Sequence, residues 1–130
     1  MAQIIKVPSL EEFDAAFDEA KKDPFFVAIF VGGPHPDNSE ISWCDDCDNA
    51  KPNLENILLK NTTLKVLWVI VQTKDEWKGV ADHKYKVHED LKLNGIPTAL
   101  LFNDGAQVMR AESEADFKNE ELLMAMAKPE

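Results

Sequence analysis

The chain has 130 residues, 45% of them hydrophobic and 29% charged, a mixture typical of a folded globular protein. This length fits one domain over residues 1–130, large enough to bury a core without disulfides or metals to hold it together. A net charge of −10, from 24 acidic residues against 14 lysines and arginines, disfavours nucleic acid and anionic membranes as partners.

The first residues, MAQIIKVPSLEEF, lack the apolar core and cleavage site of a secretory signal and the arginine-rich composition of a transit peptide. The longest apolar runs, 25–31 and 66–71, have the length of strands, so no membrane span is expected. We therefore expect a cytoplasmic protein, in which any disulfide is transient because thiols are kept reduced.

The first elements alternate between strand and helix. Residues 4–7 predict a short strand, and Ser9 with Glu12 forms a capping-box pattern that predicts the start of a helix. This helix is expected to stop near Pro24, since proline cannot continue a helix. The nearly continuous apolar run 25–31 then predicts a strand buried on both faces.

The middle of the chain combines a loop, a helix and a strand. Residues 32–42 (GGPHPDNSEIS) are rich in Gly, Pro, Asn and Ser and predict an irregular loop. Apolar residues recur at helical spacing from Cys44, so a helix is expected to begin there, with a kink at Pro52. Residues 63–71 predict a second buried strand, and this strand–helix–strand order indicates a parallel crossover.

The last part of the chain completes an α/β pattern. A polar loop (QTKDEWKGVADHK) precedes a short helix over 85–91. A strand over 98–103 and a hairpin turn lead into a strand over 108–111, and a final helix covers 114–128. The sequence therefore predicts an α/β fold, with a mixed sheet of about five strands and helices on both faces.

Both cysteines of the chain, Cys44 and Cys47, lie in the segment SWCDDCDNAKP at the predicted helix start. Purely structural thiols are disfavoured because this position is expected to be too exposed for simple packing. A zinc set with His83 and His88 is also disfavoured. A buried strand separates the two pairs, whereas zinc motifs usually have about 12 to 15 residues between them, and two histidines in a polar loop are expected to be solvated.

Dithiol redox chemistry is the favoured interpretation of the pair. A C-x-x-C spacing at the start of a helix lets two sulfurs close a small ring while one stays accessible. The unpaired N–H groups and partial positive charge of the first helical turn favour the thiolate of Cys44. We therefore expect Cys44 to attack a substrate disulfide and Cys47 to resolve the mixed disulfide, with no metal or cofactor bound by the chain.

A family resemblance supports this interpretation. With Trp43 before the cysteines, Pro52 after them and Ile96-Pro97-Thr98 opening a late strand, nearly the whole chain resembles a thioredoxin-fold oxidoreductase. The resemblance implies a thioredoxin fold, a cis peptide bond before Pro97, and a substrate groove formed by Trp43, Ile96 and Pro97.

Within that superfamily the chain is similar to the thioredoxin domain-containing protein 17 family. The similarity rests on three features: Trp43-Cys44-Asp45-Asp46-Cys47, the long loop 32–42, and Trp77-Lys78. It implies a monomeric disulfide reductase that acts on small-molecule or protein disulfides. Its electrons are expected from NADPH through thioredoxin reductase.

The chain departs from its relatives at two positions. Asp45 stands where this family has proline and where thioredoxin has glycine. Thioredoxins also carry a buried aspartate in the strand before the active site, whereas Ile29 or a neighbour stands there in this chain. Asp46 is then the candidate that helps to deprotonate Cys47.

The acidic residues near the cysteines have two possible meanings. Acids in a first helical turn complement the helix dipole by about 0.3 to 1 kcal/mol each, so Asp45 and Asp46 need no redox role. Alternatively, five acids make the rim of the site acidic, raise the pKa of Cys44 and favour basic or zwitterionic disulfides; these are Asp37, Glu40, Asp45, Asp46 and Asp48.

A function from another class is a non-catalytic binding or adaptor module. Such a module keeps the thioredoxin fold and recognises partners in the groove beside Trp43 and Pro97. The intact cysteine pair argues against it, because an adaptor needs neither sulfur.

Overall fold

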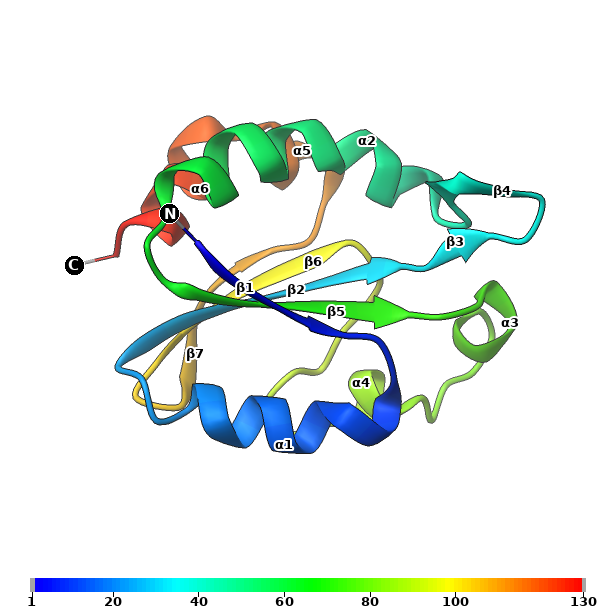
Figure 1. Ribbon diagram of the computed structural model, residues 1–130, viewed down its shortest axis with the longest axis horizontal. Helices are drawn as coiled ribbons and strands as arrows, with labels where there is room; N and C mark the ends of the chain where they lie inside the picture. Colours follow the sequence, from blue (N-terminus) through cyan, green and yellow to red (C-terminus); the bar gives the residue numbers. More distant parts are fainter. Residues whose placement is uncertain (1, 130) are drawn as a thin grey trace.

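A five-stranded mixed sheet lies at the centre of the computed structural model, which describes residues 2–129 (Figure 1). In spatial order the strands are β1 (Gln3–Val7), β5 (Lys65–Val71), β2 (Phe25–Gly32), β6 (Thr98–Asn103) and β7 (Ala106–Ala111). The β1 and β2 strands run parallel to β5, whereas β6 is antiparallel to both β2 and β7. The predicted mixed sheet is confirmed.

Helices cover both faces of this sheet (Figure 1). One face carries α1 (Leu10–Ala20) and α4 (Lys84–Val87), and α3 (Lys74–Trp77) follows the end of β5. The other face carries α2 (Asp45–Asn53), the π-helix η1 (Leu54–Leu59), α5 (Glu114–Lys118) and α6 (Glu120–Ala127). The predicted strand–helix–strand crossover is therefore the path from β2 through α2 and η1 to β5.

The buried strand β2 divides the core between the two faces, since successive side chains of a strand point in opposite directions. Phe26 and Phe30 belong to the apolar cluster that packs under α1. Val27, Ile29 and Val31 belong to the cluster that also contains both cysteines and the apolar side of α2. The strand thus supplies an entirely apolar floor beneath the cysteine pair.

The segment 32–42, predicted as an irregular loop, instead forms a small antiparallel hairpin. Its strands are β3 (Pro34–His35) and β4 (Asn38–Ser42), and it projects from the end of β2 (Figure 1). The Asp37 N–H donates to His35 Nδ1 at 3.0 Å, and the Glu40 N–H donates to Asn38 Oδ1 at 3.0 Å. These local bonds order a polar turn. Its strands lack the alternating apolar residues from which a hairpin could be predicted.

Three helix details differ from the sequence-based expectation. Ser9 Oγ donates to the Glu12 carboxylate at 2.8 Å, so α1 begins as predicted but without the side-chain-to-backbone bonds of a capping box. Pro52 lies within α2, and the hydrogen bonding changes to the π pattern two residues later. The predicted single final helix is broken at Asn119, whose side chain accepts the Leu122 N–H at 3.1 Å and starts α6.

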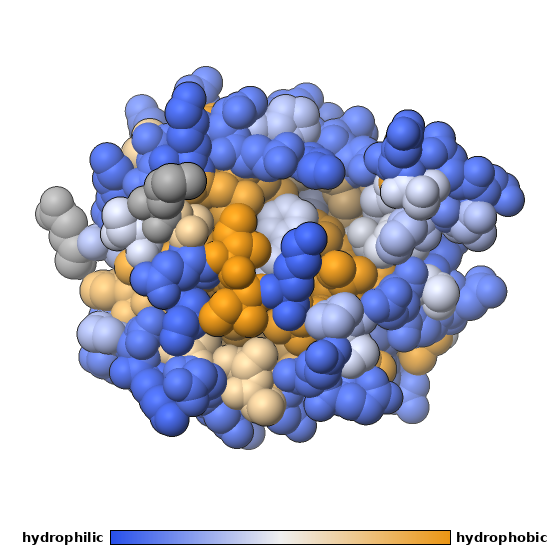
Figure 2. Space-filling model, in the orientation of Figure 1, coloured by the Kyte–Doolittle hydropathy of each residue, from blue (hydrophilic) through white to orange (hydrophobic). Residues whose placement is uncertain are grey.

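One edge strand of the sheet is β1, which pairs only with β5 in the described chain, and the other is β7, which pairs only with β6. Ile4 and Ile5 on β1 are 48% and 38% exposed. Figure 2 shows apolar residues gathered in the middle of this face, with polar residues above and below. None of the helices within residues 2–129 combines the length and the apolar character required to cross a membrane.

Candidate active site

The cysteine pair lies where the hairpin meets the first turn of α2. Cys44 is the N-cap residue of this helix, and its sulfur accepts the backbone N–H of Cys47 at 3.2 Å. The two cysteines form a disulfide with their Cα atoms 5.2 Å apart. Cys44 is 8% exposed and Cys47 4% exposed. The expectation of an exposed pair was therefore wrong, because the ends of β2 and β6 and the side chain of Trp43 surround it.

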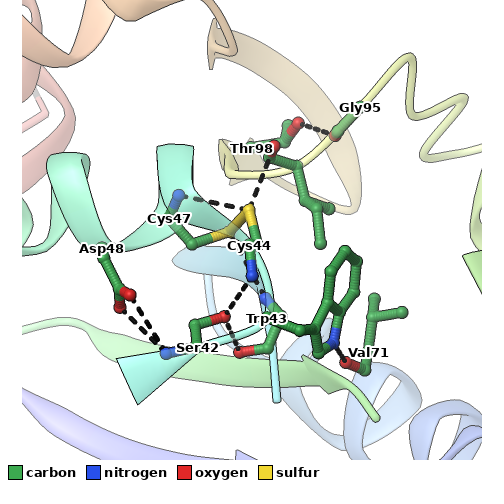
Figure 3. Close-up of a disulfide and its surroundings, with 10 residues drawn as sticks. Ser42, Trp43, Cys44, Cys47, Asp48, Val71, Gly95 and Thr98 are labelled. Carbon is green, nitrogen blue, oxygen red and sulfur yellow. Dashed lines mark hydrogen bonds between the residues drawn. A yellow bond between two sulfur atoms is a disulfide. The ribbon is translucent and has the colours of Figure 1, made fainter. Parts of the chain in front are cut away.

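Backbone groups at the end of β2 hold Cys47 directly and Cys44 through Ser42, whose bond to the Cys44 N–H is drawn in Figure 3. The Gly32 N–H points at Cys47 Sγ at 3.4 Å. The Gly32 carbonyl accepts Ser42 Oγ–H at 3.0 Å, and Ser42 Oγ accepts the Cys44 N–H at 3.0 Å. A Cβ atom on Gly32 would lie 2.8 Å from the Cβ of Cys44, closer than real Cβ atoms approach. The strand end can therefore reach the disulfide only because residue 32 has no side chain.

Trp43 is fixed beside the disulfide by a neighbouring strand. Its indole N–H donates to the Val71 carbonyl, the last residue of β5, at 3.0 Å (Figure 3). Its backbone N–H donates to the Gly33 carbonyl at 3.1 Å. The half-buried ring contacts the apolar clusters of both faces, so it closes the sheet end next to Cys44.

The three aspartates of the first helical turn have different surroundings. Both carboxylate oxygens of Asp48 accept the Ser42 N–H, at 3.2 and 3.1 Å, and tie the hairpin to α2 (Figure 3). Asp45 and Asp46 are exposed. Within residues 2–129 no hydrogen bond joins Asp46 to Cys47, so a role for Asp46 in deprotonating Cys47 stays a prediction.

The Ile96–Pro97 segment lies against Cys44. The Ile96–Pro97 peptide bond is cis, as the family resemblance implied, and the Ile96 carbonyl oxygen is 3.7 Å from Cys44 Sγ. Thr98 Oγ1 donates to the Gly95 carbonyl at 2.7 Å and closes the turn before β6 (Figure 3). A cavity of about 200 Å³ adjoins Ile96 and Pro97 and is also lined by Asp46 and Phe117. Substrate contact by Trp43, Ile96 and Pro97 stays a prediction that this placement permits.

The two-cysteine, two-histidine set is not assembled in the described chain. His83 packs on Trp77 and Tyr85, and His88 packs on Phe13, in the cluster on the other face of the sheet. His83 is 5% exposed, so the expectation that it is solvated was wrong. Burial lowers the pKa of His83 and favours its neutral form.

Sequence reasoning missed Gly32, Ser42 and Val71, which position the pair and Trp43, and it named Asp48 only as an acid of the rim. Only one signal pointed to them: a Gly-Gly step directly after a buried strand is typical of a close backbone approach. Ser42, Asp48 and Val71 make contacts between separate segments of the chain, so no local sequence pattern predicts these contacts. The cysteines and Trp43, in contrast, lie together in a single motif.

Comparison with known proteins places this site in a familiar fold. A family model described as "Thioredoxin domain-containing protein 17-like, thioredoxin domain" matches residues 6–129. A search of curated protein sequences finds no significant match.

Solved structures with the same fold include thioredoxins from distant organisms. Thioredoxin from Nicotiana alata has a TM-score of 0.63 and 17% identity, covering 98% of this chain and 95% of that one. Thioredoxin from Trypanosoma brucei brucei has a TM-score of 0.58 and 18% identity, covering 93% and 88%. A mutant thioredoxin from Halobacterium salinarum has a TM-score of 0.57 and 20% identity, covering 97% and 92%. These likenesses establish the thioredoxin fold.

Proposed function

Because the chain belongs to the thioredoxin domain-containing protein 17-like family of thioredoxin domains, we propose that it is a thiol–disulfide oxidoreductase that reduces disulfides. One observation carries the proposal: a C-x-x-C pair at disulfide distance opens α2, with the Cys47 N–H directed at Cys44 Sγ. That N–H and the helix terminus stabilise negative charge on Cys44 more than on Cys47, which is one turn further in.

The reaction transfers two electrons in two thiol exchanges. The Cys44 thiolate attacks one sulfur of the substrate disulfide, and the other sulfur leaves as a thiolate that takes up a proton. The Cys47 thiol then loses its proton and attacks Cys44 Sγ, which releases the second substrate thiolate and forms the Cys44–Cys47 disulfide. In total, one dithiol is oxidised and one disulfide is reduced to two thiols.

A lower pKa at Cys44 has a smaller effect on the rate at which Cys44 attacks a disulfide than on its ability to act as a leaving group. A pKa of about 6.5 instead of about 8.5 raises the thiolate fraction at neutral pH about 25-fold, while nucleophilicity falls about 8-fold. The net gain in attack is therefore only about 3-fold. The larger benefit is that a low-pKa thiol leaves readily, so an unproductive mixed disulfide is reversed quickly; in the resolving step the substrate thiolate is the leaving group.

Further properties of the proposed enzyme follow from the family. We propose that NADPH-dependent thioredoxin reductase reduces the Cys44–Cys47 disulfide again, so that the chain itself binds no cofactor. The chain then acts as a cytoplasmic monomer on small-molecule or protein disulfides.

A reductase-coupled assay tests this function. NADPH consumption is measured with thioredoxin reductase and either cystine or a protein disulfide, for the wild type and for Cys44→Ser. We expect turnover by the wild type and none above background by Cys44→Ser. Equal, slow turnover by both would reject the enzyme and favour a binding module that uses the groove beside Trp43 and Pro97.

A further inference from the structure

A second cavity, which we term the hairpin cavity, adjoins the disulfide from the side of the β3–β4 hairpin. Its volume is about 170 Å³, and its lining includes Gly32, Glu40, Cys47, Asp48, Lys51 and Trp68. Cys47 borders this cavity, whereas Cys44 Sγ lies near the Ile96 carbonyl. The resolving cysteine therefore has an environment of its own, distinct from the groove proposed for the substrate.

The charged groups around the hairpin cavity come from the hairpin and from α2. The hairpin contributes Glu40, and α2 contributes Asp48 and Lys51, while Val31, Trp68 and Ile70 on β2 and β5 are uncharged. Asp46, also on α2, lines the cavity beside Pro97 instead.

Lys51 is the only cation that lines the hairpin cavity within residues 2–129. It follows Cys47 by four positions, so helical geometry places both residues on the same face of α2. Both Asp48 oxygens accept the Ser42 N–H, whereas none of the ion pairs of the described chain contains Lys51. Its ammonium group is thus available to act on the cavity.

The resolving step requires such a charge. Cys47 must become a thiolate while it is almost fully buried, and burial disfavours the charged form. The floor beneath it is apolar, formed by Val27, Ile29 and Val31, and offers neither an acid nor a cation. The Gly32 N–H is a single weak donor to this sulfur at 3.4 Å.

We propose that Lys51 stabilises the Cys47 thiolate across the hairpin cavity and thereby sets the pH dependence of the resolving step. This inference rests on the proposed dithiol function. The Cys47 proton passes to water, the thiolate attacks Cys44 Sγ of the mixed disulfide, and the departing substrate thiolate takes up a proton. Lys51 contacts none of the reacting atoms and acts as a positioning residue through its charge, against the opposing charges of Asp48 and Glu40.

A thiolate titration tests the proposal without any substrate. The pKa of Cys47 is measured by ultraviolet absorbance in a Cys44→Ser chain, alone and combined with Lys51→Gln, Lys51→Arg or Lys60→Gln. Lys60 is an exposed lysine of the same helical run, so its replacement is the matched change of charge. We expect Lys51→Gln to raise the pKa by about half a unit, within the range of exposed charge pairs. Lys51→Arg should preserve the pKa, and Lys60→Gln should leave it unchanged.

Two further measurements distinguish an effect of the Lys51 charge from a structural effect of its replacement. Added salt should reduce the difference in the Cys47 pKa that Lys51→Gln makes. In stopped-flow oxidation of the two-cysteine protein by an aromatic disulfide, Lys51→Gln should slow the second thiol release about twofold at pH 7, since the lower thiolate fraction is partly offset by higher nucleophilicity. Above the pKa of Cys47 the order should reverse, with Lys51→Gln faster by about 1.7-fold, because only the difference in nucleophilicity remains.

An unchanged or lower pKa in Lys51→Gln, or an equal shift in Lys60→Gln, would overturn the proposal. The titration remains valid if the reductase assay fails, so the two failures are distinguishable. If Lys51→Gln does not fold, Lys51→Met replaces it in the same titration, and a pKa of Cys47 that does not rise contradicts a stabilising cation.

Discussion

Gly32 shows how a residue without a side chain determines the geometry of the site. Its N–H reaches Cys47 Sγ and its carbonyl accepts Ser42 Oγ–H, so one peptide segment supports both cysteines. An added Cβ would meet Cys44 Cβ and Ser42 Oγ at 2.8 Å each. Cys44 caps α2 and Ser42, the last residue of β4, is bonded to the Cys44 N–H, so neither can move independently of the disulfide.

Gly32→Ala is therefore expected to displace the cysteine pair. We predict a loss of about 1 to 3 kcal/mol in the free energy of unfolding, the usual cost of overpacking, together with a lower rate of disulfide reduction. Urea unfolding and the reductase-coupled assay measure the two effects. Gly95→Ala is the matched control, since nothing lies within 4 Å of the Cβ it adds. Equal stability of Gly32→Ala and wild type would refute this account of the strand end.

At the residue scale the reactive groups were predictable from the sequence, but the residues that hold them in place were not. Cys44, Cys47 and Trp43 are adjacent in one motif, and the family resemblance implied the cis bond before Pro97 that the structure shows. The supports are backbone groups and polar side chains that meet across segments, such as Ser42 with Asp48. Their hydrogen bonds depend on the folded hairpin, which the sequence pattern did not reveal.

Among the elements, the β3–β4 hairpin depends on α2 for its anchor. The Asp48 carboxylate accepts the Ser42 N–H with both oxygens and is half-buried. We predict that Asp48→Ala lowers the free energy of unfolding by about 1.5 to 2 kcal/mol, the lower part of the range for hydrogen bonds to charged groups. Asp37→Ala removes the same charge from an exposed position in the turn of this hairpin. Equal losses in the two variants, measured by urea unfolding, would mean that Asp48 acts only through its charge.

His83, in the segment between α3 and α4, is expected to make the stability of the fold depend on pH. His83 Nδ1 accepts the Tyr85 N–H at 3.1 Å, so the proton of the neutral ring lies on Nε2, which is buried and lacks a partner within residues 2–129. Burial lowers the pKa of His83 in the folded protein. Below its unfolded pKa of about 6.5, the unfolded chain therefore binds more protons and stability decreases as the pH falls.

His83→Asn tests this assignment because asparagine can still accept the Tyr85 N–H but does not titrate. We expect the free energy of unfolding of the wild type to fall more steeply between pH 7.5 and about 5.5 than that of His83→Asn. Urea unfolding at several pH values gives both slopes. Parallel slopes would show that His83 does not contribute to the acid sensitivity.

The long apolar elements were predictable, and the short polar ones were not. Strands β2, β5 and β6 are buried runs whose character is visible in the sequence, and α1 follows helical spacing. The break at Asn119 interrupts an apolar pattern that continues on both sides, so periodicity alone gave one helix. The burial of His83 depends on packing against Trp77 and Tyr85, which a polar local sequence hides.

For the whole molecule, the net charge of −10 predicts how salt affects substrate choice. Asp45 and Asp46 are exposed beside the disulfide, so the local field has the same sign as the overall charge. We expect reduction of the acidic disulfide of glutathione to accelerate as ionic strength rises from about 0.01 to about 0.15 M, while reduction of the basic disulfide cystamine slows. Initial rates under thioredoxin reductase coupling test this. A glutathione rate that is unchanged or falls with salt would contradict the acidic-rim hypothesis.

The most direct test of the central claim is to trap the mixed disulfide. Reduced Cys47→Ser is mixed with excess cystine, and intact-mass spectrometry follows the protein. We predict one stable cysteine adduct located on Cys44, whereas the wild type forms the Cys44–Cys47 disulfide, releases both substrate thiols and retains no adduct. A stable adduct on the wild type, or an adduct that forms on Cys47 of Cys44→Ser as fast as on Cys44 of Cys47→Ser, would contradict the assignment of Cys44 as the attacking thiol and Cys47 as the resolving one.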